Sequence, residues 1–234
     1  MNAGILNIFL PPRCVCCDDI TDRDFPVCDN CRALIIEPSE EKQSCKACFL
    51  KKSSCICRKR QYYEKLSVCF FYEGAAKRTV QKFKFRARPD LARGYSELIY
   101  SSLKKRNMLE DTQLITFVPM SKARRFMRGY NQSELLAKHL SDISGIPCKG
   151  LLKREGRSSI QHSLKGFSRT GNLLGIFEPD KSCRDEIKGK TVLIVDDVYT
   201  TGSTLNEIAK TLLIFGADKV YAASCTAVKK QKKY

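Results

Sequence analysis

The sequence predicts an α/β fold, a parallel sheet flanked by helices, with a small cysteine-rich module in front of it. Residues 192–195 (VLIV) form a continuous apolar run, which is typical of a strand buried on both faces of a parallel sheet. After a short polar loop, apolar residues from 205 to 213 recur at helical spacing. Nine of the thirteen cysteines lie before residue 60, most of them in close pairs.

The other elements of the α/β domain are predicted from the same two kinds of pattern. Residues 66–72, 114–118 and 219–227 are rich in aromatic and β-branched residues, which predicts strands. Residues 75–88, 90–105 and 135–140 carry apolar residues at helical spacing. We therefore divide the chain into a cysteine module (1–60), an α/β domain (61–228) and a basic tail (229–234).

Composition narrows the class of protein. A chain of 234 residues that is 43% hydrophobic and 29% charged is typical of a globular protein with one sizeable core. The net charge of +17 favours phosphate-rich partners, which include nucleotides, nucleic acids and anionic membranes. The apolar run at residues 5–10 is too short for a secretory signal or a membrane span, so we expect a cytoplasmic protein without membrane insertion.

The paired cysteines predict two zinc ions, because repeated C-x-x-C spacings in a reducing compartment supply the four thiolates that each tetrahedral zinc needs. The simplest assignment is sequential, with Cys14, Cys17, Cys28 and Cys31 for one ion and Cys45, Cys48, Cys55 and Cys57 for the other. A crossed pairing, a competition between Cys16 and Cys17, and disulfides are alternatives. The other cysteines lie among apolar residues and are predicted to be packing residues: Cys69, Cys148, Cys183 and Cys225.

The stretch after residue 195 carries the candidate catalytic chemistry. Asp196 and Asp197 end the predicted strand, where carboxylates can hydrogen-bond sugar hydroxyls or hold a magnesium shell. The loop that follows leads into a helix whose N-terminal N–H groups attract a phosphate. Its residues are Thr200, Thr201, Gly202, Ser203 and Thr204. The alternatives are an ordinary loop and the Walker B strand of an ATPase, but no G-x-x-x-x-G-K-[ST] motif precedes it.

Two basic segments add candidate anion-binding residues. In residues 75–88, Lys82, Lys84, Arg86 and Arg88 alternate with phenylalanines, a mixture that suits single-stranded DNA. The alternative is an amphipathic helix whose basic face is only solvated. The predicted loop after residue 118 gathers further cations at a helix start, and its candidates are Ser121, Lys122, Arg124, Arg125, Arg128 and Gly129.

The stretch VLIVDDVYTTGST resembles the signature of type I phosphoribosyltransferases, which bind phosphoribosyl diphosphate (PRPP). Together with the cysteine pairs, the segment VPMSKARRFMRGYNQSELLA and residues 154–172, it is similar to the ComF family, amidophosphoribosyltransferase-like proteins linked to bacterial DNA uptake. Tyr130 stands in the R-G-[FY]-N-Q piece, where Phe is more usual.

This resemblance implies roles for the candidate residues. Asp196 and Asp197 would be catalytic and would bind PRPP with the 200–204 loop, Asp197 would hold magnesium, and residues 121–129 would receive the pyrophosphate. Residues 153–172 would close over PRPP as a lid, or would be only a surface loop. The lid candidates are Arg157, Gln161, Lys165 and Arg169. The implied partners are PRPP, single-stranded DNA, a DNA-uptake helicase and further copies of the chain in a homo-oligomer.

Two functions of different classes follow from these observations. The first is a PRPP-dependent transferase, whose acceptor the sequence does not identify. The second is a non-catalytic single-stranded DNA-binding competence factor that uses PRPP as a ligand or regulator. A PRPP-sensing transcriptional regulator is a third alternative, which is disfavoured because no helix-turn-helix pattern occurs before residue 60.

Overall fold

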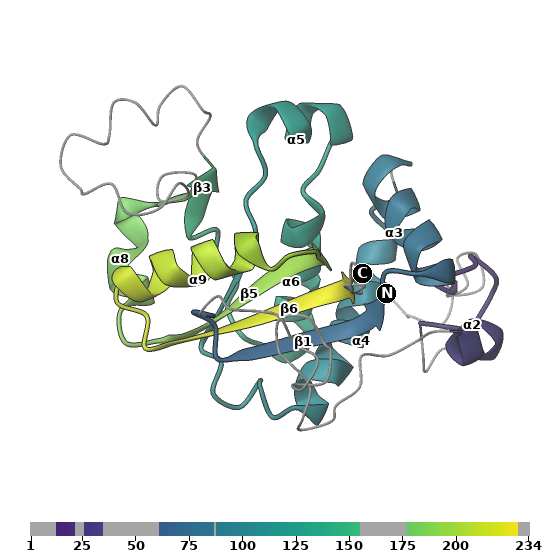
Figure 1. The fold of residues 1–234 in the computed structure, drawn as a ribbon, viewed down its shortest axis with the longest axis horizontal. Helices are drawn as coiled ribbons and strands as arrows, with labels where there is room; N and C mark the ends of the chain where they lie inside the picture. The colour runs from purple at the N-terminus through teal and green to yellow at the C-terminus, as the bar shows by residue number, and fades with distance from the viewer. Residues whose placement is uncertain (1–12, 22–25, 35–60, 87, 155–176, 229–234) are drawn as a thin grey trace, which may run out of the picture.

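The computed structural model describes residues 13–21, 26–34, 61–86, 88–154 and 177–228. Their centre is a four-stranded sheet in the order β1-β6-β5-β2, in which every neighbouring pair is parallel. The strands are β1 (Lys65–Phe71), β2 (Leu114–Phe117), β5 (Thr191–Tyr199) and β6 (Lys219–Ala227). Figure 1 shows the carboxyl ends of β1, β5 and β6 at one edge of the sheet. The predicted parallel α/β fold is therefore confirmed.

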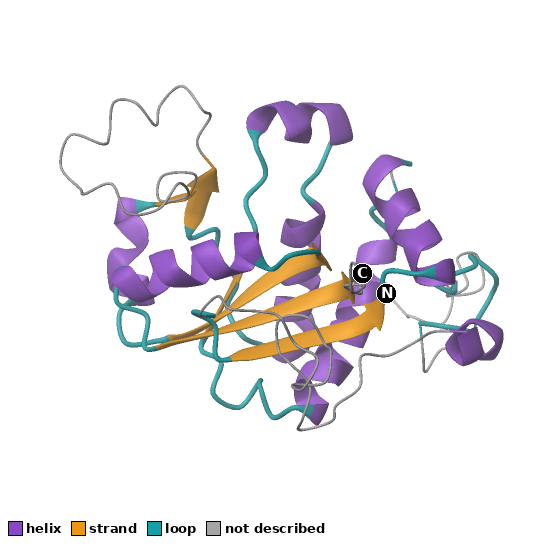
Figure 2. Cartoon of the chain, in the orientation of Figure 1, coloured by secondary structure: helices purple, strands orange, loops and turns teal. Residues whose placement is uncertain are grey.

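Helices cover both faces of this sheet (Figure 2). The first group consists of α4 (Leu91–Lys105) and α6 (Gln132–Ser144), and α3 (Gly74–Phe85) adds buried side chains to its core cluster. The second group is α9 (Ser203–Ile214), and α8 (Arg184–Ile187) adds a buried side chain to its cluster. Leu193 and Val195 of β5 pack with the first group, whereas Val192 and Ile194 pack with the second. The continuous apolar run follows from this arrangement, because a strand covered on both faces has no solvent side.

Shorter elements lie at the margins of the sheet. They are α2 (Asp29–Leu34), α5 (Lys122–Arg128), the 3-10 turn η2 (Lys181–Cys183), and an antiparallel pair formed by β3 (Leu152–Arg154) and β4 (Phe177–Pro179). The β3–β4 pair brackets residues 155–176, which contain the lid candidates. In the described part of the chain, no helix is long and apolar enough to cross a membrane.

The structure corrects two local predictions and bears on one alternative. β5 continues through Asp196 and Asp197 to Tyr199, so the acids lie inside a strand rather than at its end. The segment after β2 contains a short helix, α5, rather than a loop alone. α3 is amphipathic, with Val80 and Phe83 buried, but its basic face is not only solvated, because Lys84 pairs with Asp197.

The cysteines predicted to be packing residues are confirmed in that role. Cys69, Cys183 and Cys225 are buried in the two core clusters, and Cys148 packs against one of them while remaining partly exposed. Burial raises the pKa of the Cys225 thiol, so this side chain behaves as a small apolar residue.

The described part of the cysteine module packs into the same core as α3 and α4. Val15 and Cys16 are buried in one cluster with side chains of these helices. The Thr79 hydroxyl of α3 donates to the Cys16 carbonyl at 2.8 Å. Arg88 donates to the two carboxylate oxygens of Asp18 at 2.7 and 2.9 Å. Apolar contact, a buried hydrogen bond and a bidentate ion pair therefore fix this module against the two helices.

Gly94 marks the close approach of this module to α4. A Cβ at this position would lie 2.5 Å from Val15 Cγ1 and 3.0 Å from Pro26 Cβ. Helix propensity alone would make Gly94→Ala stabilising by about 1 kcal/mol. We expect overpacking to reverse that sign and to lower the free energy of unfolding by about 1–3 kcal/mol. Urea unfolding measures the change, with Ser101→Ala on the exposed face of α4 as the control. A stabilised Gly94→Ala protein would contradict this packing.

Candidate functional site

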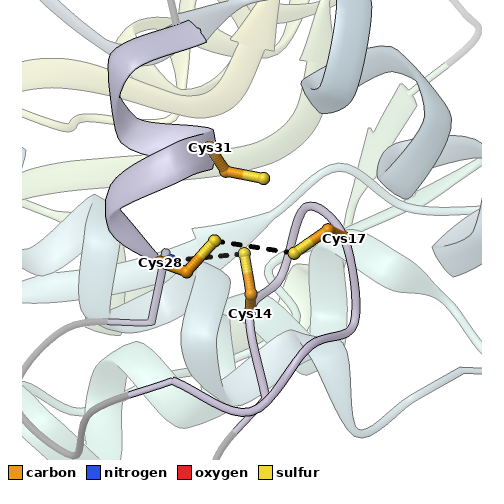
Figure 3. Close-up of side chains that lie close together, drawn as sticks. All are labelled: Cys14, Cys17, Cys28 and Cys31. Atoms are coloured by element: carbon orange, nitrogen blue, oxygen red, sulfur yellow. Dashed lines mark hydrogen bonds between the residues drawn. The ribbon is translucent and has the colours of Figure 1, made fainter.

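Four cysteines of the first two pairs lie together (Figure 3). The Sγ atoms of Cys14, Cys17, Cys28 and Cys31 all lie within 4.8 Å of one another. The backbone N–H groups of Cys16 and Cys28 both donate to Cys14 Sγ at 3.3 Å. Four sulfur atoms at these separations form a cluster that could hold one tetrahedral metal ion, in agreement with the sequential assignment for the first site.

The thiols of this cluster need a cation in order to ionise together. Burial raises the pKa of Cys14, but the backbone N–H groups of Cys28, Cys17 and Cys16 outweigh that effect and bring the pKa down to about 7. Burial raises the pKa of Cys31 to about 12, and the charge of Cys14 adds to the rise. A bound divalent ion would remove this mutual repulsion, and four thiolates are a donor set that fits zinc.

Cys16 does not belong to the metal cluster that the described residues form. Its side chain is buried, and burial together with the charge of Cys14 raises the pKa of its thiol to about 12. In the competition with Cys17, the structure therefore favours Cys17 as the ligand. The residues predicted for the second zinc, Cys45, Cys48, Cys55 and Cys57, lie outside the described residues.

A pair of cysteine variants tests the metal cluster. We expect Cys31→Ala to lower the zinc content of the purified full chain by about one equivalent, because a structural zinc site needs all four ligands. Cys16→Ala should leave the zinc content unchanged, since its sulfur lies outside the cluster. Elemental analysis by mass spectrometry gives both values. Equal zinc losses in the two variants would show that the ligand set is different.

The two predicted acids lie near the carboxyl end of β5. They follow Val195, which pairs with Phe117, the last residue of β2. Asp196 Oδ1 accepts hydrogen bonds from the Ser133 hydroxyl at 3.0 Å and from the Asp197 N–H at 2.9 Å. Asp197 is 9% exposed, and its Oδ2 lies 3.0 Å from Lys84 Nζ of α3. Neutral donors therefore hold one acid, and a cation holds the other.

Burial gives the acidic pair an unusual charge state. It raises the pKa of Asp196 to about 7, and the charge of Asp197 adds to the rise, whereas the Asp197 N–H, the Ser133 hydroxyl and Lys84 oppose it. At neutral pH the pair consequently carries fewer than two negative charges. A protonated carboxyl donates a hydrogen bond and a carboxylate accepts one, so such a pair can satisfy two neighbouring hydroxyls of a sugar.

Residues 200–202 connect β5 to α9, whereas Ser203 and Thr204, which were predicted to lie in the loop, belong to the first turn of the helix. Gly202 precedes α9 with a φ of +75°, and a Cβ there would lie 2.4 Å from the Tyr199 hydroxyl, so the position requires glycine. Thr201 Oγ1 accepts from the Ser203 N–H at 3.3 Å and lies 2.8 Å from Ser203 Oγ. Thr200, Thr201 and Ser203 are exposed. These hydroxyls, with the N-terminal N–H groups of a twelve-residue helix, form a surface suited to a phosphate.

The residues predicted to receive pyrophosphate lie on and around α5. Ser121 caps this helix by accepting from the Arg124 N–H at 3.4 Å, and Gly129 ends it with a φ of +79°. Lys122 and Arg124 are exposed, whereas Arg125 pairs with Glu134 of α6 at 3.1 Å. Figure 1 shows α5 standing away from the sheet. The structure therefore keeps these cations together on α5, but Arg125 is already paired with an acid of the same chain.

Arg154, at the end of β3, is a cation that the sequence analysis did not single out as a site residue. Burial lowers its pKa, and the charge of Arg124 lowers it further. The two guanidinium groups are thus near enough to repel each other, although β3 and α5 are separate in sequence. An anion near both groups would relieve this repulsion, so Arg154 joins the candidates for pyrophosphate binding.

The R-G-Y-N-Q piece connects α3 to the site. The Tyr130 hydroxyl and Gln132 Nε2 both donate to the Phe83 carbonyl in the last turn of α3, at 2.5 and 3.3 Å. Arg128 Nη1 donates to Gln132 Oε1 at 3.4 Å, and its guanidinium lies 5.0 Å from the centre of the Phe85 ring. The hydroxyl that distinguishes Tyr130 from Phe therefore has a defined hydrogen-bonding role.

The next two residues complete this connection. Asn131 donates to the Val118 carbonyl at 3.0 Å and caps α6 by accepting from the Ser133 N–H at 3.2 Å. Ser133 then reaches Asp196 with its hydroxyl. These positioning residues were missed as functional residues by the sequence analysis, although an Asn just before an apolar helical pattern is a recognisable capping signal.

The four cations predicted to bind single-stranded DNA lie on α3 and in the segment that follows it. Lys84 pairs with Asp197, and Arg88 pairs with Asp18 and Asp90. Lys82 is half-buried and Arg86 is exposed. Two of the four cations are thus already committed to acids of the same chain. The lid candidates, Arg157, Gln161, Lys165 and Arg169, lie outside the described residues.

Comparison with known proteins gives the class first. The model of the phosphoribosyl transferase domain matches residues 132–234, which include α6, β5 and α9. Similar solved structures include a glutamine PRPP amidotransferase from B. subtilis (19% identity, TM-score 0.41, 62% of this chain and 30% of that chain). Another is a purine phosphoribosyltransferase from Pyrococcus horikoshii (18% identity, TM-score 0.36, 60% of this chain and 85% of that chain). The family match shows a phosphoribosyltransferase-like domain over residues 132–234.

Relatives of similar length define the family. Competence protein F of Haemophilus influenzae is 31% identical over 202 residues, which cover 85% of this chain and 83% of that protein. Competence protein ComFC of Streptococcus pneumoniae is 30% identical, and the match covers 84% of this chain and 86% of that protein. DNA utilization protein YhgH of Escherichia coli K12 is 28% identical, and the match covers 88% of this chain and 86% of that protein. The chain belongs to the ComF family, as its motifs predicted.

Proposed function

We propose that this protein binds PRPP at Asp196, Asp197 and the 200–204 loop, and that it acts in the cytoplasm in natural competence and DNA uptake. One observation carries the first part: an acidic pair able to satisfy a diol and an exposed hydroxyl loop at a helix N-terminus occur on one strand–loop–helix unit. The names of its relatives, which refer to competence and to DNA utilization, support the second part.

In this arrangement the ribose hydroxyls lie against the two acids, and the 5-phosphate lies in the 200–204 loop. The pyrophosphate extends toward the cations of α5 and toward Arg154. Carboxylate oxygens suit magnesium, which would be held through Asp197 and would neutralise charge on the pyrophosphate. The chain's own residues bind and orient the sugar phosphate on either side of its anomeric carbon.

Transfer at such a site breaks the bond between ribose C1 and a pyrophosphate oxygen. Pyrophosphate leaves with the bonding electron pair, and a lone pair of the acceptor forms the new bond to C1. Positive charge develops on the sugar ring and negative charge on the leaving group. Asp196 and Asp197 would stabilise the ring, and Arg124 with Arg154 would stabilise the pyrophosphate. The acceptor is a nucleophile whose class no described residue identifies.

Substitution of the two acids tests this proposal. Asp196→Asn and Asp197→Asn should each weaken PRPP binding at least about tenfold, because each substitution removes a carboxyl that shares the negative charge of the pair and so weakens its charge-assisted contacts to the ribose. Titration calorimetry with PRPP and magnesium measures binding, and pyrophosphate release with a panel of bases measures turnover. Asp142→Asn, whose carboxyl is exposed on α6, is the matched control. If both site variants bind PRPP normally, the ligand site is elsewhere.

A second function, the binding of single-stranded DNA, is favoured by the surface of α5. This helix buries no residue, and Phe126 and Met127 are 92% and 83% exposed. Phe85, which contacts Arg128, is 69% exposed at the end of α3. Exposed aromatic rings among cations can stack on bases and neutralise phosphates. In this alternative PRPP is a ligand or regulator, and a DNA-uptake helicase or a second copy of the chain is a further partner.

Variants of these rings test DNA binding. Phe126→Ala and Phe85→Ala should each weaken binding of an oligothymidine by about 1–3 kcal/mol, because each loses a stacking contact. Lys122→Ala should reduce the salt dependence of the affinity by about 0.7 in the log–log slope. Fluorescence anisotropy at several salt concentrations gives both values. Ile214→Ala, an exposed apolar residue of α9, is the control. Unchanged affinities in both ring variants would exclude this surface.

A further inference from the structure

Lys84 lies against the acidic pair, although it belongs to a basic helix. Its side chain is 19% exposed, that of Asp197 is 13% exposed, and Nζ lies 3.0 Å from Oδ2. A surface lysine usually keeps its ammonium in water. This pair is largely withdrawn from solvent, so dissolved salt screens it only weakly.

The last turn of α3 holds Lys84 in place. The preceding residue, Phe83, is fully buried, and its carbonyl accepts hydrogen bonds from Tyr130 and Gln132. Further up the same helix, Thr79 donates to the Cys16 carbonyl of the cysteine module. The backbone that carries the ammonium is thus anchored at both ends of this stretch, and Lys84 is part of the fixed frame of the site.

We propose that Lys84 is the resident counter-ion of Asp197, and that a divalent cation binds this carboxylate only by displacing the ammonium. This inference rests on the proposed function, in which magnesium accompanies PRPP. Both cations need the same carboxylate oxygen, and two cations a few ångströms apart repel each other strongly where water is scarce. Free magnesium therefore binds this site weakly.

The consequence is selectivity for a metal–diphosphate complex over the metal alone. A diphosphate brings oxygen ligands for the metal, and it also brings an anionic partner for the released ammonium. Lys84 thereby keeps the acidic pair neutralised when no sugar diphosphate is present. It is a specificity-determining residue for this site.

Binding of Mn²⁺ alone, a probe with the same preference for oxygen ligands, tests the competition. The full chain is titrated with Mn²⁺ while free Mn²⁺ is followed by electron paramagnetic resonance. Lys84→Met should bind Mn²⁺ at least about tenfold more tightly than the parent chain, because it keeps the length of the side chain and removes the competing charge. Lys82→Met, which removes the same charge from the same helix, should change the affinity by less than about twofold.

The double variant Lys84→Met/Asp197→Asn should lose the gain in affinity. A gain that persists in the double variant, or an unchanged affinity in Lys84→Met, would overturn the proposal. If Lys84→Met does not fold, NMR of the lysine ammonium groups of the parent chain tests the proposal instead. The Lys84 signal is the one that disappears in Lys84→Arg. Millimolar Mg²⁺ should shift that signal in the parent chain but not in Asp197→Asn. Because PRPP is absent from this experiment, its result is independent of the PRPP-binding test.

Discussion

The carbonyl of Phe83 is the point on which the arrangement of the site depends. The last carbonyls of an α-helix have no partner within the helix, and α3 offers this one to Tyr130 and Gln132. These bonds hold the end of α3 against the segment between α5 and α6, and the same segment places Ser133 on Asp196. The R-G-Y-N-Q piece is therefore a structural connector that brings a lysine and a serine to two neighbouring acids.

The main elements of the fold could be predicted from the sequence because their apolar residues repeat with a clear period. The last strand was predicted with the limits that the structure shows, Lys219–Ala227. α5 could not be predicted in this way, because it buries no residue and therefore has no apolar face. The extension of β5 to Tyr199 depends on its pairing with β6, where Val198 lies opposite Thr226, and a local pattern does not report such pairing.

The candidate site was predictable where its chemistry is local in sequence. The acids and the 200–204 loop form one stretch, and Cys14, Cys17, Cys28 and Cys31 follow a regular spacing. Lys84 was assigned to a DNA surface because a run of charges does not reveal which cations already face an acid. Asp197 lies more than a hundred residues from Lys84 in the sequence, and Asp196 lies 63 residues from Ser133, which contacts it from α6. Such pairings are set by the tertiary fold, which brings α3, α6 and β5 into one core cluster.

The contact between Val15 and Gly94 bears on how this architecture could evolve. The segment around Cys14 and Cys17 packs directly against α4. It can do so because Gly94 of this helix has no side chain where Val15 approaches. Transfer of this segment to an unrelated transferase would require a glycine at the position of Gly94. It would also require a hydroxyl at the position of Thr79 in α3, which donates to the Cys16 carbonyl. The two parts are therefore expected to be inherited together rather than shuffled as independent modules.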